Sequence, residues 1–278
     1  MTENVPTITV HPDQPGADLG DLYGIFFEDL NHAADGGLYA EMVQNRSFEF
    51  CMVDNPEYHA LTAWETAQGT PLQPTPLTLR VLIDAPLNPT NQHYLQVDTH
   101  EPLTIRNHGY NQGMYFQDGA VYNFSVFARK LYAPVTLTIA LTDEAGQVLA
   151  SGETVITAND WRQYRVSLVS QATTTTGRLQ VTISGNAHVS LDMISLFPKE
   201  TFKGRANGVR KDLGEKLAAL QPKFMRFPGG CLVHDGSLDP RDRDASYRWK
   251  NSIGPVEARP ARRNSWGYNQ TLGLGYFE

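Results

Sequence analysis

Hydrophobic and polar residues alternate along the middle of the chain, from about residue 62 to residue 198. This pattern is typical of β-strands that bury one face, and turn residues such as Asp118-Gly119 separate the alternating segments. Seven such segments, rich in Val, Thr, Leu and Tyr, favour a β-sandwich of jelly-roll type. They are residues 77–83, 93–97, 122–129, 135–141, 162–168, 178–183 and 188–196.

Two runs that flank this region are almost continuously apolar. The run from Gly24 to Phe27 precedes Glu28, and the run that begins at Phe224 ends in Pro228 and two glycines. Short runs that end in charged residues or glycines are expected for parallel strands buried on both faces. A further strand is expected near the N-terminus, at residues 7–10.

A helix is predicted between the sandwich and the second apolar run. Its apolar positions recur at helical spacing, Asp212 and Lys216 are placed to pair one turn apart, and Pro222 stops the pattern. The order strand, helix, strand indicates a βαβ unit with the sandwich inserted into it, at little cost in loop-closure entropy if the ends of the insert lie close together. The apolar helix positions are Val209, Leu213, Leu217 and Leu220.

Composition narrows the classes of function. Hydrophobic residues make up 41% and charged residues 19%, which is ordinary for a packed globular protein, and no stretch reaches the roughly 20 apolar residues that span a bilayer. The formal net charge of -7, from 23 basic and 30 acidic side chains, opposes binding to nucleic acid or to an anionic membrane. A neutral polar ligand fits this charge better.

Cysteine and histidine give no sign of a metal or a cofactor. Cys51 and Cys231 are the only cysteines and lie far apart, so the sequence has no disulfide framework, and none of the eight histidines forms an HExxH pair. We therefore expect no cofactor and no metal. The first residues lack the charged and apolar regions of a secretory signal, which favours the cytoplasm, with an extracellular location as the alternative.

Candidate binding residues follow the two apolar runs. Glu28 and Asp29 come after the first run, and Arg226 with Cys231 comes at the end of the second. The carboxyl ends of parallel strands meet at one edge, where a carboxylate and a guanidinium can hydrogen-bond several sugar hydroxyls. An alternative of equal weight is that Glu28 and Arg226 form only an ion pair that caps the strands.

Four sequence blocks, in this order, resemble the α-L-arabinofuranosidases of glycoside hydrolase family 51. The resemblance covers residues 23–49 and roughly residues 202–278, and the sandwich between them resembles the cellulose- and xylan-binding jelly-roll modules that some members carry. The blocks are Gly24-Ile-Phe-Phe-Glu-Asp-Leu-Asn-His-Ala-Ala-Asp-Gly-Gly and its continuation to Glu49, Phe224-Met-Arg-Phe-Pro-Gly-Gly-Cys231, Tyr247-Arg-Trp-Lys-Asn-Ser-Ile-Gly-Pro-Val-Glu257 and Asn264-Ser-Trp-Gly-Tyr-Asn269.

The resemblance implies a (β/α)8 barrel with a second β-sandwich, which releases terminal arabinofuranosyl groups with retention during arabinan or arabinoxylan degradation. That mechanism uses a nucleophile and an acid/base, two carboxyl groups about 5–5.5 Å apart. In the family both are glutamates on later strands, so we expect the catalytic residues to lie beyond residue 278 and residues 1–278 to be inactive alone. The resemblance also implies a homo-oligomer for the full-length enzyme.

Four substrate-binding residues carry over from the resemblance. Glu28 matches a glutamate that binds arabinose hydroxyls, and Arg226 matches an arginine that supports the site. Cys231 stands where some members have asparagine, and a buried structural thiol is its alternative role. Trp249 resembles a subsite tryptophan, although packing is the commoner role of a tryptophan. Around them, Asp29, Asn31 and His32 are expected to shape the pocket, His32 as a structural histidine.

Other aromatic and basic residues are weaker candidates. An arginine cluster near residue 260 is expected to be a solvated, ion-paired loop rather than an anion site. Four aromatic residues of the sandwich are candidates for a sugar platform, with core packing as the alternative. The arginines are Arg259, Arg262 and Arg263, and the aromatic residues are Trp64, Tyr110, Tyr115 and Tyr132.

The predicted fold class is therefore α/β plus all-β, a partial barrel interrupted by a jelly-roll module. Residues 1–58 hold the N-terminal strand and the first barrel strand with its loop, residues 59–198 the module, and residues 199–278 the first barrel helix, the second strand and the following loop. Only the module is expected to close a core by itself, so proteolysis should leave roughly 130–140 residues. Two alternatives stay open, a non-catalytic carbohydrate-binding protein and a β-glucan-cleaving relative.

Overall fold

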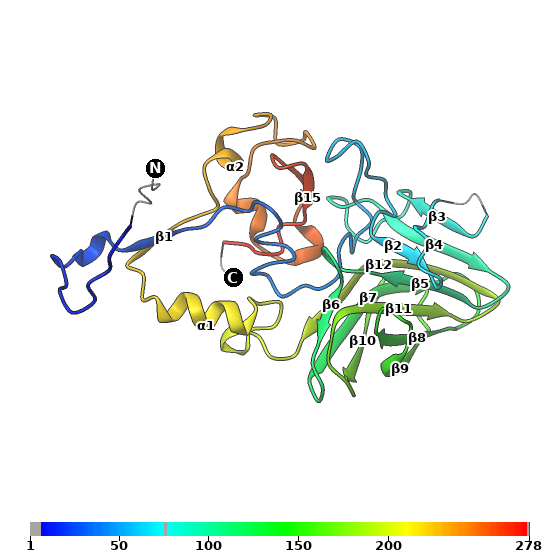
Figure 1. Cartoon of the computed structure of the whole chain (residues 1–278). Coiled ribbons are helices and arrows are strands. Elements are labelled where there is room, and N and C mark those ends of the chain that lie inside the picture. Colours follow the sequence, from blue (N-terminus) through cyan, green and yellow to red (C-terminus); the bar gives the residue numbers. More distant parts are fainter. Residues whose placement is uncertain (1–6, 75–76, 277) are drawn as a thin grey trace, which may run out of the picture.

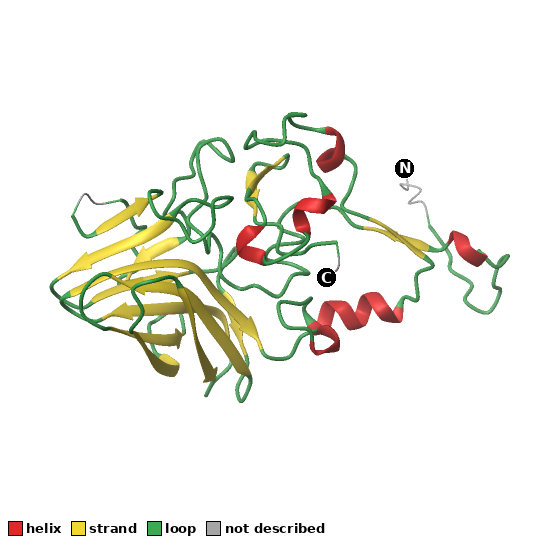
Figure 2. Ribbon diagram, turned by 180° about the vertical axis from the view of Figure 1, so that it is seen from behind, coloured by secondary structure: helices red, strands yellow, loops and turns green. Residues whose placement is uncertain are grey.

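The computed structural model describes residues 7–74, 77–276 and 278, and it consists mainly of strands and loops with few helices (Figures 1 and 2). Two antiparallel sheets occupy the middle of the chain, one in the order β10-β7-β12-β4-β3 and one in the order β2-β5-β11-β8-β9, with β6 beside β11. The strands are β2 (Trp64–Thr66), β3 (Leu79–Leu82), β4 (Tyr94–Thr99), β5 (Leu103–Asn107), β6 (Met114–Phe116), β7 (Val121–Lys130), β8 (Val135–Thr142), β9 (Val148–Ile156), β10 (Arg162–Val169), β11 (Thr174–Ile183) and β12 (Ala187–Pro198).

The two sheets bury one hydrophobic core between them, and we call this unit the sandwich. Strand β7 shows the reason, because the alternate residues Tyr122, Phe124 and Val126 are buried while Asn123, between the first two, is exposed. All seven predicted strands are present. Four others, β2, β5, β6 and β9, were not predicted, since most are short and β9 carries Gly152 and exposed polar residues.

Residues before the sandwich complete its core. Val43 and Phe48 are buried within it, and the Phe48 ring stacks on Trp64 with ring centroids 5.6 Å apart. The indole N–H of Trp64 donates to the backbone oxygen of Asn45 at 3.0 Å, so this residue is part of the core and not of a sugar platform. Glu41 accepts the backbone N–H of Leu196 at 3.0 Å. The segment from residue 41 to residue 63 is therefore packed with the sandwich.

A parallel strand pair lies at the other end of the molecule (Figure 1). Strands β1 (Gly24–Phe26) and β13 (Phe224–Arg226) pair with Ile25 opposite Met225, as the two apolar runs predicted. Burial on both faces was also predicted, and that is wrong for this chain, because Phe26 is 55% and Phe224 52% exposed. Within the described residues no further strand pairs with either one.

The predicted helix is present as α1 (Lys211–Ala219), and it packs beside a second small core that includes Tyr39, Phe197 and Val209. The expected pairing of Asp212 with Lys216 is wrong. Asp212 pairs instead with Arg210, whose guanidinium nitrogen lies 2.6 Å from the carboxylate, because Arg210 immediately precedes the helix and reaches its first turn.

The remaining elements are short, and residues 237–276 run between the strand pair and the sandwich (Figure 1). The structure assigns no strand to residues 7–10, where an N-terminal strand was expected, and these residues are exposed. No helix in the described ranges has the length and apolar character to cross a membrane. The short elements are η1 (Gly20–Leu22), η2 (Phe202–Gly204), α2 (Cys231–His234), η3 (Trp249–Ser252), η4 (Val256–Ala258), β14 (Arg262–Asn264) and β15 (Tyr268–Gln270).

Candidate active site

The Glu28 carboxylate lies where the carboxyl ends of β1 and β13 meet. Its Oε1 atom accepts the backbone N–H groups of Gly230 and Cys231, both at 3.0 Å. Gly229 makes this approach possible, because a Cβ there would lie 2.3 Å from Cγ of Glu28 and the residue has a φ of +127°. The structure thus brings together Glu28 and the glycine turn, as the strand order predicted.

One oxygen of Glu28 is left for a ligand. Both N–H groups bind Oε1, and within the described residues no hydrogen bond is made by Oε2. The side chain is only half-buried. A carboxylate fixed by two backbone donors through one oxygen can accept a hydrogen bond from a sugar hydroxyl through the other.

Arg226 adds an exposed cation next to this carboxylate. Its guanidinium carbon lies 4.7 Å from the centroid of the Phe26 ring, and a Cβ on Gly230 would be 3.1 Å from its Nη2 atom. Among the described residues Glu28 is bound by the backbone N–H groups of Gly230 and Cys231 and forms no ion pair with Arg226, which argues against the alternative in which the two residues only cap the strands as an ion pair. No hydrogen bond of the Arg226 guanidinium is found within the described part of the chain, so its donors are open to a ligand near Gly230.

Cys231 and Trp249 have different positions relative to Glu28. Cys231 begins α2 and contributes its backbone N–H to Glu28, while its thiol is free and half-buried. Trp249 is 47% exposed in η3 and packs on Tyr276, with ring centroids 5.1 Å apart. None of the described ring or hydrogen-bond contacts joins Trp249 to Glu28 or Cys231, so the structure brings together three of the four predicted binding residues.

Asp29 holds the loop that follows β1 through hydrogen bonds of its carboxylate and its backbone oxygen. Its buried carboxylate accepts the N–H of Ala34 at 2.9 Å and lies 3.0 Å from the hydroxyl of Tyr268. Asn264 donates to the backbone oxygen of Asp29 at 2.9 Å. Burial, with a smaller effect of the nearby Asp35 carboxylate, raises the pKa of Asp29 to about 7. Sequence reasoning assigned no role to Tyr268 or Asn264, because more than 200 residues separate them from Asp29.

His32 lies between two aromatic rings. Its ring centroid is 4.1 Å from that of Tyr268 and 5.4 Å from that of Tyr110. Burial lowers the pKa of His32, so the ring is neutral at pH 7. This packing fits the structural role expected for His32. It also removes Tyr110 from an open sugar platform, whereas Tyr115 and Tyr132 are exposed on the sandwich.

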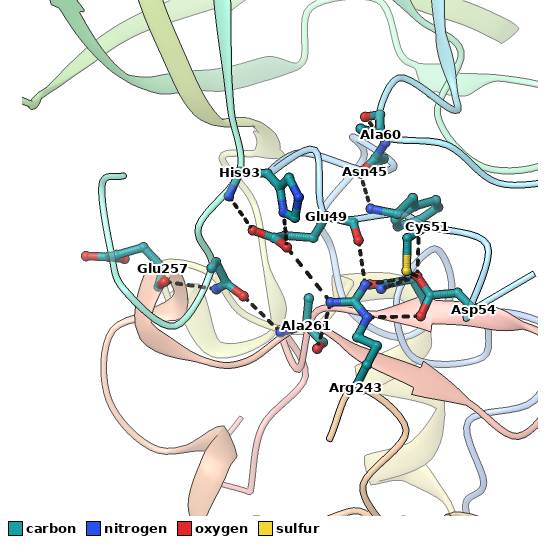
Figure 3. A network of polar contacts seen from close by, with 12 residues as sticks. Asn45, Glu49, Cys51, Asp54, Ala60, His93, Arg243, Glu257 and Ala261 are labelled. Carbon is teal, nitrogen blue, oxygen red and sulfur yellow. Dashed lines mark hydrogen bonds and ion pairs between the residues drawn. The ribbon is translucent and has the colours of Figure 1, made fainter. Parts of the chain in front are cut away.

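A polar network joins the sandwich to the segments around the site (Figure 3). Arg243 donates to Asp54 at 2.9 Å, to the backbone oxygen of Glu49 at 2.5 Å and to that of Ala261 at 3.0 Å. The Glu49 carboxylate also lies 2.7 Å from Nδ1 of His93, which immediately precedes β4. Arg243 therefore links three segments distant in sequence, and no local pattern in the sequence indicated this role.

The arginine cluster is not the solvated loop that was expected. Arg259 and Arg262 are buried, with 5% and 7% of their surface exposed. Arg259 donates to the backbone oxygens of Leu272 and Gly273, both at 2.9 Å, and Arg262 donates to that of Pro240 at 2.8 Å. The guanidinium N–H groups thus bind backbone oxygens of loops that have no regular secondary structure. Buried backbone oxygens need such donors.

Known proteins match this chain over nearly its whole length. It is 47% identical to an extracellular exo-α-L-arabinofuranosidase of Streptomyces chartreusis, with 98% of this chain and 32% of that protein covered. It is 33% identical to α-L-arabinofuranosidase 1 of Arabidopsis thaliana, with 92% of this chain and 38% of that protein covered. The chain is homologous to the α-L-arabinofuranosidases. This confirms the resemblance seen in the four sequence blocks.

Structure and a family model agree with this relationship. The solved structure of the arabinose-bound α-L-arabinofuranosidase MgGH51 matches with a TM-score of 0.77 and 33% identity, and the match covers 92% of this chain and 41% of that one. The model described as the α-L-arabinofuranosidase 1 domain matches residues 216–278. The chain spans about a third to two fifths of the length of these arabinofuranosidase relatives.

Proposed function

We propose that the protein carrying this chain is a retaining α-L-arabinofuranosidase, and that Glu28 and Arg226 bind the arabinofuranosyl group. The observation that carries the proposal is the Glu28 carboxylate, fixed through one oxygen by Gly230 and Cys231 at the joint edge of β1 and β13. Homology to α-L-arabinofuranosidases supports the choice of sugar. The substrate class is arabinofuranosyl-containing oligosaccharides or polysaccharides.

The proposed architecture places β1, α1 and β13 in a (β/α)8 barrel and gives the sandwich the jelly-roll fold of a carbohydrate-binding module. The parallel pairing of β1 with β13 and their exposed apolar side chains support the barrel, because such strands need neighbours on both sides. The domain division is 1–58, 59–198 and 199–278, with the addition that Val43 and Phe48 pack into the sandwich core.

The proposed chemistry assigns binding to this chain and bond cleavage to residues outside it. A retaining glycosidase needs a nucleophile and an acid/base, and we place both glutamates beyond residue 278. Glu28 accepts a hydrogen bond from a sugar hydroxyl, and Arg226 donates to an oxygen of the same sugar. Charged hydrogen bonds of this kind orient the sugar relative to the reacting groups. Asp29 is buried and holds the loop that carries Glu28.

The binding-protein alternative has less support. A sugar platform needs exposed aromatic rings, and Trp64 and Tyr110 are packed against other residues. Two polar side chains of the five-stranded sheet, Gln96 and Ser190, are buried and hydrogen-bonded to each other at 2.8 Å, so they offer no open polar contact to a sugar. Tyr132, 70% exposed, is the aromatic residue of the sandwich best placed to meet a ligand.

An extracellular location is proposed in place of the cytoplasm, because the Streptomyces relative is named as extracellular. Homo-oligomeric assembly of the full-length protein is part of the proposal, and light scattering after gel filtration tests it.

The decisive experiment compares substrates with the full-length protein. It should hydrolyse an aryl α-L-arabinofuranoside, with the first arabinose released in the α configuration when followed by proton NMR. Residues 1–278 alone are the matched control and should give no turnover above the uncatalysed rate. Cleavage of a β-glucan without cleavage of the arabinofuranoside would assign the protein to the alternative substrate, and binding of arabinoxylan without any cleavage would favour the binding protein.

A further inference from the structure

The loop that follows Glu28 contains two successive residues in the left-handed backbone region. Asn31 and His32 both have positive φ, 51° and 59°, in the left-handed region that most residues avoid. The backbone N–H of Leu30 donates to the oxygen of Glu28 at 2.9 Å, so the start of this loop is tied directly to Glu28. A strained loop of this kind persists when contacts from outside hold it.

Tyr110 supplies such a contact from the sandwich. It lies in the connection between β5 and β6, and its ring centroid is 5.4 Å from that of His32. The same ring covers Gly36, where φ is +92° and a Cβ would lie 2.4 Å from the ring atoms. Tyr110 therefore packs against two points of the loop, and one of them has room only for glycine.

The position of Tyr110 is set independently of the loop. Asn107, fully buried at the end of β5, donates to the backbone oxygen of Gln44 and accepts the N–H of Gly109, both at 2.9 Å. The N–H of Gly113 donates to the oxygen of Tyr110 at 3.2 Å. Hydrogen bonds within the sandwich thus fix the β5–β6 connection that carries Tyr110.

His32 also packs on a second ring, which contacts the residue next to Glu28. The Tyr268 ring lies 4.1 Å from His32, and its hydroxyl donates to the backbone oxygen of Asp29 at 2.8 Å. His32 is thereby held between Tyr110 and Tyr268. Loss of the Tyr110 ring would remove one of the two ring contacts of His32, next to the segment that carries Glu28 and Asp29.

We propose that Tyr110 is a positioning residue for Glu28, through which the sandwich holds the loop in the conformation that lets the Glu28 carboxylate meet the N–H groups of Gly230 and Cys231. The inferred consequence for sugar binding rests on the proposed function, whereas the effect on the loop does not. The inserted sandwich is on this account a part of the sugar site and not an appended module.

The first test measures amide hydrogen exchange in the full-length protein. In Tyr110→Ala the amides of Gly230 and Cys231 should exchange about tenfold faster, because their bonds to Glu28 open more often. Tyr110→Phe keeps the ring and should match the wild type. Tyr115→Ala removes an exposed tyrosine of neighbouring β6 and is the matched control. If Tyr110→Ala fails to fold, Tyr110→Leu serves in its place. Unchanged exchange at both amides in the folded variant overturns the proposal.

The second test measures kinetics in the full-length protein. Tyr110→Ala should lower kcat/KM for an aryl α-L-arabinofuranoside about tenfold, mainly through KM, with Tyr110→Phe restoring it. A purely structural role would lower the melting temperature and leave kcat/KM unchanged well below it, which would contradict the proposal. A wild-type protein without arabinofuranosidase activity would contradict the proposed function alone, since the exchange test still decides the role of Tyr110.

Discussion

Tyr268 donates its hydroxyl proton to the backbone oxygen of Asp29 at 2.8 Å, although 239 residues separate the two. The same hydroxyl lies 3.0 Å from the buried carboxylate, which also accepts the N–H of Ala34. This contact fixes the residue that follows Glu28 and links β15 to the loop after β1. It also places an ionisable group where its charge is poorly solvated.

Burial of Asp29 makes the stability of the chain depend on pH. Its pKa is raised from 3.8 to about 7 in the folded protein, so the folded state binds more protons than the unfolded state between these values, and this group lowers stability as the pH rises from about 4 to 7. The difference corresponds to ~4 kcal/mol at most. Relative to wild type, Asp29→Asn should therefore gain stability over this range in urea unfolding.

Asp160→Asn is the matched control for this measurement, because Asp160 is an exposed partner of Arg162. Replacing this surface carboxylate should leave the urea midpoint close to that of wild type. A constant difference between Asp29→Asn and wild type from pH 4 to pH 8 would show that Asp29 does not titrate in this range.

The Glu28 carboxylate should matter for sugar binding in the full-length protein. Glu28→Ala and Arg226→Ala should each lower kcat/KM by roughly 10- to 1000-fold, the range for the loss of charged hydrogen bonds to a bound sugar. Glu28→Gln keeps an oxygen that can accept hydrogen bonds from the N–H groups of Gly230 and Cys231. The decrease in kcat/KM of this variant therefore reports the loss of the negative charge alone. Glu153→Gln, at an exposed position of β9, is the control. Activity of both alanine variants within about twofold of wild type would show that Glu28 and Arg226 have only a structural role.

Arg243 should be the most sensitive position of the network in Figure 3. Arg243→Lys is expected to lower the free energy of unfolding by about 2–3 kcal/mol, because one ammonium cannot reach Asp54 and the backbone oxygens of Glu49 and Ala261 together. Arg241→Lys, which changes an 86% exposed arginine, should leave the urea midpoint close to that of wild type. Equal midpoints of the two variants in urea would mean that the network adds no stability.

Limited proteolysis should report the extended sandwich. Val43 and Phe48 lie in its core, and Arg243 ties residues 49–54 to the C-terminal segment. The resistant piece should therefore begin near residue 38 and be larger than the 130–140 residues that the strand pattern alone suggested. Cleavage is expected first in residues 7–22, which are exposed. Mass spectrometry of the products checks this, and early cleavage between residues 43 and 58 would contradict it.

Local pattern determined much of the fold. The seven alternating segments became strands because side chains two residues apart share a face wherever a strand pairs. Strand β9 escaped prediction because it lies at the edge of its sheet, where exposed residues such as Glu153 replace the apolar positions. Likewise, the N-terminal run at residues 7–10 has strand-like residues but is not assigned as a strand, so composition alone did not decide its structure.

The candidate site divides in the same way. The sequence by itself placed Glu28 beside Gly230 and Cys231, because the carboxyl ends of parallel strands share an edge. The glycines also indicated that the backbone approaches another group closely there. The tertiary structure alone decided the roles of Tyr110 and Tyr268, because their contacts with the Glu28 loop join distant segments. Such contacts follow from how the sheets and loops pack in space, and packing leaves no period in the sequence that a local pattern can reveal.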